Sequence, residues 1–242
     1  MSRSIILLFG SAAYVFFFAT FLYLIAFVGN LPWVPLTIDR GPIASTGMAS
    51  VVDLLLVALF GVQHSVMARP GFKAAWTKVV PKALERSVYV VASSLMLILL
   101  YAFWRPIVAP LWTVTAPAGQ ILLWALFGLG WGIVLLSTFL ISHFELFGLT
   151  QVWTNWRRRE IAPMNFVTPF LYKFVRHPLY LGFLIAMWSI PAMTLGHALF
   201  AGAMTVYVLI AIRYEERDLV AQLGHEYVDY RGRVGMLTPK LR

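Results

Sequence analysis

Long apolar runs constrain the fold of this chain more than any other feature of its sequence. Four runs approach the roughly 20 residues that a helix needs to cross the hydrocarbon core of a bilayer; they cover 5–28, 48–66, 88–104 and 120–141. Two shorter runs, 179–194 and 198–212, are split by the sequence PAMTLGH. Backbone groups in lipid must be satisfied within the chain, so each run is expected to be a helix.

The composition places these runs in an integral membrane protein. Hydrophobic residues make up 60% of the 242 residues and charged residues only 12%, whereas a soluble domain is about half apolar and a quarter charged. The run 5–28 is longer than the core of a cleaved signal peptide and lacks a small-residue cleavage site, so we expect a retained first span. The absence of cysteine excludes disulfides, thiolate metal sites and a cysteine nucleophile.

Lysine and arginine residues are concentrated in every second segment outside the apolar runs. The N-terminus, the second loop, the fourth loop and the tail carry 1, 5, 5 and 6 of them, 17 in all, whereas the first and third loops carry one each. The positive-inside rule therefore predicts both termini and loops two and four in the cytoplasm, with six crossings. This orientation accounts for the net charge of +9 without a nucleic-acid partner.

The sequence thus predicts an all-α fold, a polytopic transmembrane helix bundle of about six crossings formed by 1–242 as a single integral membrane domain. Each arm of the hairpin 179–212 would be only about 24 Å long, so we expect it to be tilted and packed, with Pro191 bending its first arm. The sequence EERDLVAQLG should extend the last helix into a cytoplasmic helical tail, with Gly224 ending that helix.

Ionisable residues gather at the predicted cytoplasmic ends of the spans, where such groups are costly and tend to face a cavity or a partner. Alternatively, the arginine and lysine side chains reach the lipid headgroups, and the carboxylates pair with these basic side chains. Two adjacent glutamates at a helix C-terminus oppose the helix dipole, so they need a cation from Arg213, Arg217 or a ligand. In chain order the gathered residues are His64, Glu85, Arg86, His143, Glu145, Arg176, His177, Glu215 and Glu216.

Several other site classes lack their sequence signature. No H-E-x-x-H, G-x-S-x-G, P-loop or G-x-G-x-x-G motif occurs, and FGLGWG lies inside the fourth span, where small residues serve helix packing. We predict no metal site, although histidines on different spans that hold haem or another metal remain an alternative. Asp53, in the second span, is expected to be hydrogen-bonded within the bundle.

Three C-terminal blocks carry a resemblance to a known family. RHPLYLG (176–182), YEERDL (214–219) and LGHEYVDYRGRV (223–234) resemble the RHPxYxG, EE and FGxxYxxY blocks of the isoprenylcysteine carboxyl and phospholipid methyltransferases of membranes. The chain departs from the family at Gly235, where a proline is common. The segments 63–90 and 142–153 are similar to bacterial methanethiol S-methyltransferases, and this resemblance covers nearly the whole chain.

The resemblance implies that S-adenosylmethionine is the cofactor and that 173–242 binds it. Glutamate carboxylates of the protein could accept hydrogen bonds from the ribose or the ammonium group of this cofactor. An arginine could bind the carboxylate of the cofactor, and tyrosine rings could pack against its adenine. The start of the fifth span offers backbone N–H groups, and Gly182 allows close approach. The residues implied are Arg176, His177, Pro178, Tyr180, Leu181, Gly182, Glu215, Glu216, Arg217, Tyr227 and Tyr230.

The resemblance further implies in-line transfer of a methyl group to the thiolate of methanethiol, which yields dimethyl sulfide. A free thiol is mostly protonated at pH 7, so a base or cationic surroundings should assist. His64 and His143 are the candidate proton acceptors, with Glu145 or Arg86 orienting or tuning them; a purely structural role is the alternative for each.

The partners expected are a small thiol and the lipid bilayer of a bacterial inner membrane, with the active site on the cytoplasmic side. One alternative is methylation of a phospholipid amine or a prenylated carboxyl group. A second alternative is a non-enzymatic membrane protein that binds a metal or haem.

Overall fold

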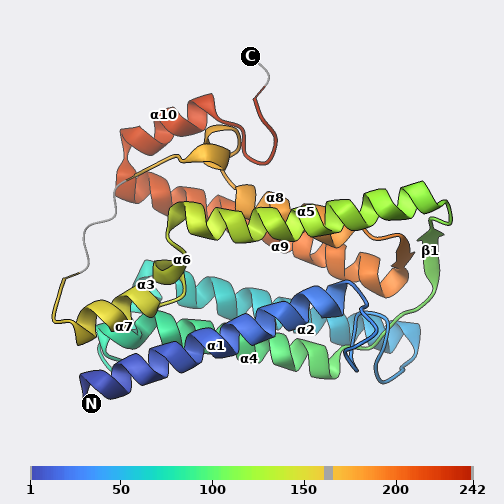
Figure 1. Cartoon of the computed structure of the whole chain (residues 1–242), viewed down its shortest axis with the longest axis horizontal. Helices are drawn as coiled ribbons and strands as arrows, with labels where there is room; N and C mark the ends of the chain where they lie inside the picture. The colour runs from blue at the N-terminus through green and yellow to red at the C-terminus, as the bar shows by residue number, and fades with distance from the viewer. Residues whose placement is uncertain (1, 161–165, 241–242) are drawn as a thin grey trace. The chain divides into compact units, whose positions relative to one another are not determined.

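The computed structural model describes residues 2–160 and 166–240, and these residues are mostly helical (Figure 1). In chain order the elements are α1 (Arg3–Val28), α2 (Thr46–Ala68), α3 (Pro70–Trp76), the 3-10 helix η1 (Lys82–Leu84), α4 (Glu85–Phe103), β1 (Pro110–Thr113), α5 (Pro117–Ile141), α6 (His143–Leu146), α7 (Leu149–Trp156), the 3-10 helix η2 (Phe170–Lys173), α8 (Pro178–Trp188), β2 (Ala192–Thr194), α9 (Leu195–Leu223) and α10 (His225–Arg233).

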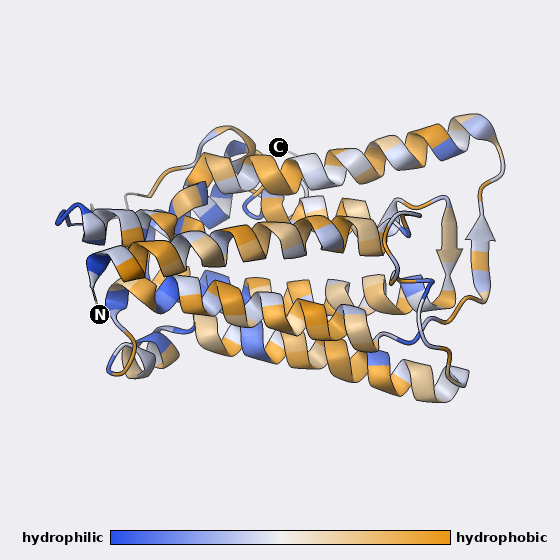
Figure 2. Ribbon diagram, turned by 60° about the horizontal axis from the view of Figure 1, so that its bottom comes forward, coloured by the Kyte–Doolittle hydropathy of each residue, from blue (hydrophilic) through white to orange (hydrophobic). Residues whose placement is uncertain are grey.

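Five helices in the described ranges are long and apolar enough to cross a membrane: α1, α2, α4 together with η1, α5 and α9. Within their apolar windows only 22% to 39% of residues are buried inside the protein, so most of the hydrophobic surface faces outward. Figure 2 shows hydrophobic residues along the length of these helices. The chain is therefore a polytopic helical membrane protein, and the predicted fold class is confirmed.

The first arm of the C-terminal hairpin is shorter in the structure than the sequence predicts. Helix α8 has 11 residues and is about 16 Å long, half the hydrocarbon thickness, so a sixth crossing stays a prediction. The expected bend at Pro191 is wrong, because α8 ends at Trp188 and β2 begins at Ala192, where it pairs with β1. The helical form of the predicted tail is confirmed, because α9 continues to Leu223 and ends at Gly224, whose φ is +59°; its cytoplasmic side stays a prediction.

The chain divides into two compact units. Unit 1 comprises Met1–Ala109, Ser142–Pro163 and Thr194–Phe200; unit 2 comprises Pro110–Ile141, Met164–Met193 and Ala201–Arg242. The proposed cofactor part, 173–242, falls in unit 2 apart from Thr194–Phe200, and its residues 241–242 lie outside the described ranges. The single integral membrane domain stays a prediction.

In unit 1, α1 packs against α4 and α7, and α2 packs against α4. Near the start of α1, Val152 of α7 is fully buried against Ile6 and Leu84. Further along the unit, the buried Asp53 carboxylate accepts a hydrogen bond of 2.9 Å from the backbone N–H of Arg105. The predicted hydrogen bonding of Asp53 within the bundle is thereby confirmed.

The first turn of α9 also belongs to unit 1. Thr194 donates its hydroxyl to Asp39 at 2.6 Å, and the backbone N–H groups of Leu195 and Gly196 donate to the carbonyls of Ala109 and Ile107. His197, in the same turn, is fully buried. These contacts tie three separate stretches of sequence into one unit.

In unit 2, α5 and α8 are packed closely along each other. The contact is centred on two glycines, Gly130 and Gly182: a Cβ atom on Gly182 would lie 2.7 Å from the Gly130 carbonyl oxygen, and one on Gly130 would lie 2.6 Å from the Ala186 nitrogen. Real Cβ atoms do not approach backbone so closely, so this spacing requires glycine at both positions.

Candidate functional site

The start of α8 is held in place by the C-terminal tail of unit 2. The backbone N–H groups of Arg176 and His177 donate to the carbonyls of Gly235 and Met236 at 2.9 and 3.2 Å. A Cβ atom on Gly235 would collide with the carbonyl oxygen of Thr238. The glycine at which the chain departs from the family motif is therefore required by the turn of its own tail.

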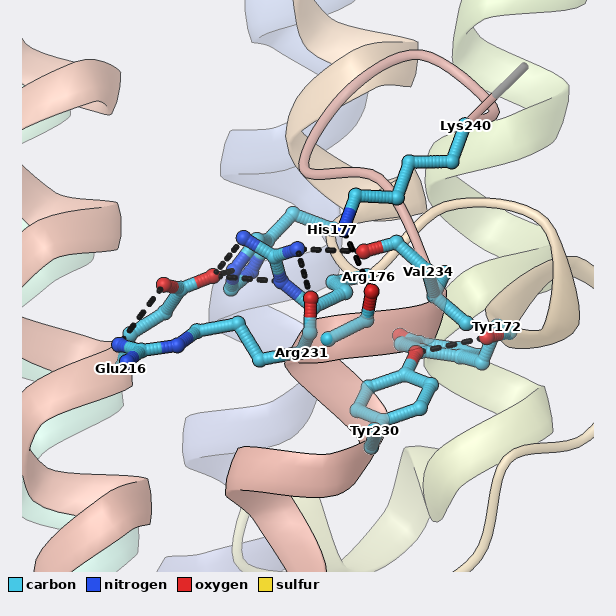
Figure 3. Close-up of polar contacts among 9 residues, drawn as sticks. Tyr172, Arg176, His177, Glu216, Tyr230, Arg231, Val234 and Lys240 are labelled. Atoms are coloured by element: carbon cyan, nitrogen blue, oxygen red, sulfur yellow. Dashed lines mark hydrogen bonds and ion pairs between the residues drawn. The ribbon is translucent and has the colours of Figure 1, made fainter. Parts of the chain in front are cut away.

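Glu216 is the centre of an ionic cluster that joins α9 to the start of α8 (Figure 3). Its Oε1 atom accepts from Arg176 at 2.7 Å and lies 3.0 Å from Nε2 of His177. Arg231 of α10 lies 3.9 Å from the other carboxylate oxygen. Arg176 also donates to the backbone carbonyls of Arg231 and Val234. The cations that two adjacent glutamates require thus come from α10 and from the segment just before α8.

Glu215 has a different partner. The hydroxyl of Tyr180, in the first turn of α8, donates to Glu215 Oε2 at 2.9 Å. The two adjacent glutamates therefore contact different residues at the start of α8: Glu216 contacts Arg176 and His177, and Glu215 contacts Tyr180.

Two tyrosines of α10 line the same part of unit 2. Tyr230 donates to the Tyr172 carbonyl at 2.6 Å, whereas the buried Tyr227 hydroxyl has no hydrogen-bond partner among the described residues. Burial, with the charge of Glu216 as a smaller contribution, raises the pKa of Tyr227; burial raises that of Tyr230 to about 12. A buried hydroxyl without a partner is costly, so Tyr227 is a candidate for binding a ligand or water.

A surface pocket of about 320 Å³ lies beside this cluster. It is lined by Arg213, Glu216, Arg217, Val220 and Arg231. Because Glu216 is already bound to Arg176, the arginines leave the pocket with a surplus of positive charge. The pocket thus offers guanidinium groups to an anion, next to a carboxylate.

The remaining residues implied by the resemblance serve the helix itself. Pro178 occupies the first turn of α8, where its missing N–H costs nothing, and the Leu181 N–H donates to the His177 carbonyl. Gly182 packs against the backbone of α5. Its close approach is to a helix, and a contact with cofactor stays a prediction.

The candidate catalytic residues lie in unit 1. His64 of α2 is 2.9 Å from the Tyr89 hydroxyl and 3.1 Å from the Ser93 hydroxyl, both on α4. The Arg86 guanidinium lies 5.1 Å from the centre of the Tyr89 ring, and its Nε–H donates to the Leu146 carbonyl at 2.6 Å. Arg86 therefore connects the surroundings of His64 with the turn that carries His143.

His143 is enclosed by aromatic rings. Its Nε2 atom is 2.8 Å from the Tyr14 hydroxyl of α1, and the rings of Phe144 and Phe147 meet it edge-on. Burial lowers the pKa of His143, which favours the neutral, proton-accepting form. Glu145, in the same turn, is half-buried, and its backbone carbonyl accepts from Gln151.

Sequence reasoning missed Tyr14, Tyr89 and Ser93. Each lies in an apolar span where a tyrosine or serine looks like ordinary packing. The contact between Tyr14 and His143 joins positions 129 residues apart, and no local motif indicates it. The described residues contain no group of three or more His, Asp or Glu side chains placed to hold a metal ion.

Comparison with known proteins identifies relatives along the whole chain. The chain is 51% identical over 239 residues to the methanethiol S-methyltransferase of Mycobacterium tuberculosis, covering 99% of this chain and 98% of that protein. It is 52% identical over 234 residues to the enzyme of the same name from a Pseudomonas species, covering 97% and 90%. Nurim of Danio rerio is 30% identical over 192 residues, covering 74% and 67%.

No family model and no solved structure matches the chain. The helical membrane fold and the C-terminal cluster, together with the Nurim relative, define an integral membrane protein of the isoprenylcysteine methyltransferase-like class. Within that class, the chain belongs to the methanethiol S-methyltransferase family.

Proposed function

We propose that this chain transfers a methyl group from S-adenosylmethionine to methanethiol and so produces dimethyl sulfide. The observation that carries the proposal is the identity of 51% over 99% of the chain with a protein named methanethiol S-methyltransferase. Identity of this extent makes a shared reaction the simplest expectation, and the residues of unit 2 suit the donor.

The chemistry of unit 2 matches the groups of S-adenosylmethionine. Its ammonium group suits Glu216, and its carboxylate suits the guanidinium groups of the pocket, Arg217 among them. The ribose hydroxyls suit Glu215, which already accepts from Tyr180. Tyr227 offers a buried hydroxyl that has no hydrogen-bond partner within 2–160 and 166–240. These side chains would bind and orient the donor.

The bound donor supplies an electrophilic methyl group on a sulfonium sulfur. The thiolate sulfur of the substrate forms a bond to that carbon as the donor's carbon–sulfur bond breaks, which leaves dimethyl sulfide and S-adenosylhomocysteine. The protein's task is to align sulfur and methyl carbon at roughly 3–3.5 Å and to take up the thiol proton.

His64 and His143 are the proposed acceptors of that proton. His143 is buried and His64 is half-buried, and each has a tyrosine hydroxyl within hydrogen-bond distance. The Arg86 charge near Tyr89 would favour a thiolate in the same surroundings. We propose that the active site opens to the cytoplasmic side of a bacterial inner membrane, as the positive-inside count indicates.

The proposal is tested with membranes that contain the chain, methyl-labelled S-adenosylmethionine and methanethiol. We expect labelled dimethyl sulfide in the headspace and S-adenosylhomocysteine in solution, and neither from membranes without the chain. Extracted lipid in place of the thiol tests methylation of a phospholipid amine or prenylated carboxyl. Label found in lipid alone would refute the thiol substrate, and a haem absorption band without S-adenosylhomocysteine would support the non-enzymatic alternative.

A further inference from the structure

Helix α7 presents its side chains in an unusual way. The Oε1 atom of Gln151 and the Nδ2 atom of Asn155 are buried and lack a hydrogen-bond partner among the described residues. In contrast, 48% of Trp153 and 39% of Trp156 is exposed. A helix facing water buries its apolar side chains and exposes its amides. The outer face of α7 is therefore built for surroundings other than water.

The exposed indoles are joined to a basic group at the end of the helix. The Arg157 guanidinium lies 5.2 Å from the Trp153 ring centre and 5.7 Å from that of Trp156. Two further exposed arginines follow, and then Glu160. Three arginines less one glutamate give this segment a charge of +2. Indole rings beside cations are typical of the headgroup level of a bilayer.

The helix ends with a strained backbone conformation at Arg158. Arg158 has a φ of +57°, a conformation that favours glycine. The Arg159 N–H donates to the Thr154 carbonyl at 2.9 Å across this turn, a helix ending in which glycine usually occupies the left-handed position. An arginine at this position is less stable than glycine would be, so fold stability alone does not explain the cation at Arg158.

We propose that Trp153, Trp156 and Arg157–Arg159 form a binding site for the phosphate of an anionic phospholipid headgroup. Positive charge attracts the anionic lipids of the cytoplasmic leaflet, where the charge count places this loop. The indoles would lie at headgroup depth, and the arginines would bind the phosphate oxygens. The site uses none of the residues assigned to methyl transfer.

The test is a titration of the full-length chain in detergent with short-chain phosphatidylglycerol, followed by native mass spectrometry. Phosphatidylcholine and inorganic phosphate are titrated in parallel, because the first lacks net charge and the second lacks a lipid. We expect phosphatidylglycerol to bind most tightly, phosphatidylcholine more weakly and inorganic phosphate most weakly. Arg159→Gln should weaken phosphatidylglycerol binding about fivefold, whereas the matched change Arg3→Gln, at an exposed arginine of α1, should leave it unchanged.

Arg158→Gly separates a binding role from a structural one. Glycine relieves the left-handed strain, so the apparent melting temperature should rise by about 2 °C while phosphatidylglycerol binding weakens about fivefold. Wild-type phosphatidylglycerol affinity in both Arg158→Gly and Arg159→Gln would overturn the proposal. So would equal binding of phosphatidylglycerol and phosphatidylcholine by the wild-type chain. Should Arg158→Gly fail to fold, the comparison of Arg159→Gln with Arg3→Gln decides.

Discussion

At the scale of single residues, the candidate site residues of unit 2 differ in whether their polar atoms already have partners. Glu216 is held by Arg176 and His177, and Glu215 by Tyr180, so both carboxylates are fixed before any ligand arrives. Tyr227 has no such partner in the described part of the chain. These are the side chains that we propose for binding the polar groups of the donor, because oriented carboxylates and an available hydroxyl favour a polar ligand.

Replacing Glu215 by Gln, or His177 by Ala, should weaken binding of S-adenosylhomocysteine about tenfold. The first change removes a charged acceptor and the second removes a group that holds Glu216, and hydrogen bonds to charged groups contribute about 1.5–3 kcal/mol. Isothermal titration calorimetry measures the affinities. His225→Ala, at the exposed start of α10, is the control, and wild-type affinity in both test variants would contradict the site.

Tyr227→Phe removes the hydroxyl without changing the packing of the ring. Since that hydroxyl has no hydrogen-bond partner in the described ranges, the apparent melting temperature without ligand should stay within about 1 °C or rise. Binding of S-adenosylhomocysteine should weaken about fivefold if the hydroxyl contacts the ligand. Thermal unfolding with and without ligand reports both quantities, and unchanged stabilisation by ligand would remove Tyr227 from the site.

His143 should make the fold sensitive to acid. Burial lowers its pKa below the unfolded value of about 6.5, so the neutral form is favoured in the folded state. This contribution is fully present above pH 6.5 and is lost as the pH falls through the folded pKa. The drop in apparent melting temperature between pH 7.5 and pH 5 should be smaller in His143→Gln, and equal drops would show that burial of His143 has no such effect.

At the scale of elements, the hydropathy of the sequence predicts the long helices because each of them satisfies its own backbone in lipid. The extension of α9 to Leu223 was likewise predictable, since Gly224 ends it with a positive φ. Three features were not predictable. They are the short α8, the pairing of β1 with β2, and the tyrosines beside His64 and His143, all of which depend on contacts between distant parts of the chain.

The contact of α5 with α8 should be the element pair most sensitive to added volume. Gly182→Ala places a methyl group against the α5 backbone and should cost about 1–3 kcal/mol. The control is Gly132→Ala on the facing helix α5, where no atom of the described residues lies within 4 Å of the new Cβ; this change should be neutral or slightly stabilising. Chemical denaturation in detergent compares the two, and equal stability would show that the close approach does not hold these helices together.

At the scale of the whole molecule, the distribution of lysine and arginine predicts the topology, with both termini and loops two and four in the cytoplasm. The division into two units, in contrast, could not be read from the sequence. Each unit takes pieces from three places in the chain, and no shift in composition marks the borders. The candidate catalytic and cofactor-binding residues fall into different units.

The topology can be measured by cysteine labelling, because the natural chain contains no cysteine. Ser45→Cys, in the exposed segment before α2, should react with a membrane-impermeant maleimide in intact cells. Lys78→Cys, in the basic segment after α3, should react only after the membrane is permeabilised. The reverse result would invert the predicted orientation and move the proposed lipid site to the outer leaflet.

Unit 1 includes Thr194–Phe200, a segment that is synthesised after the rest of that unit. Synthesis proceeds from the N-terminus, so α1, α2 and α4 emerge long before the segment that supplies the Thr194 hydroxyl to Asp39 and the N–H donors to Ala109 and Ile107. The ribosome must also complete α5 and α8 in the interval. A nonsense mutation anywhere before Thr194 therefore leaves both units unfinished, and the first cannot be recovered as an intact fragment.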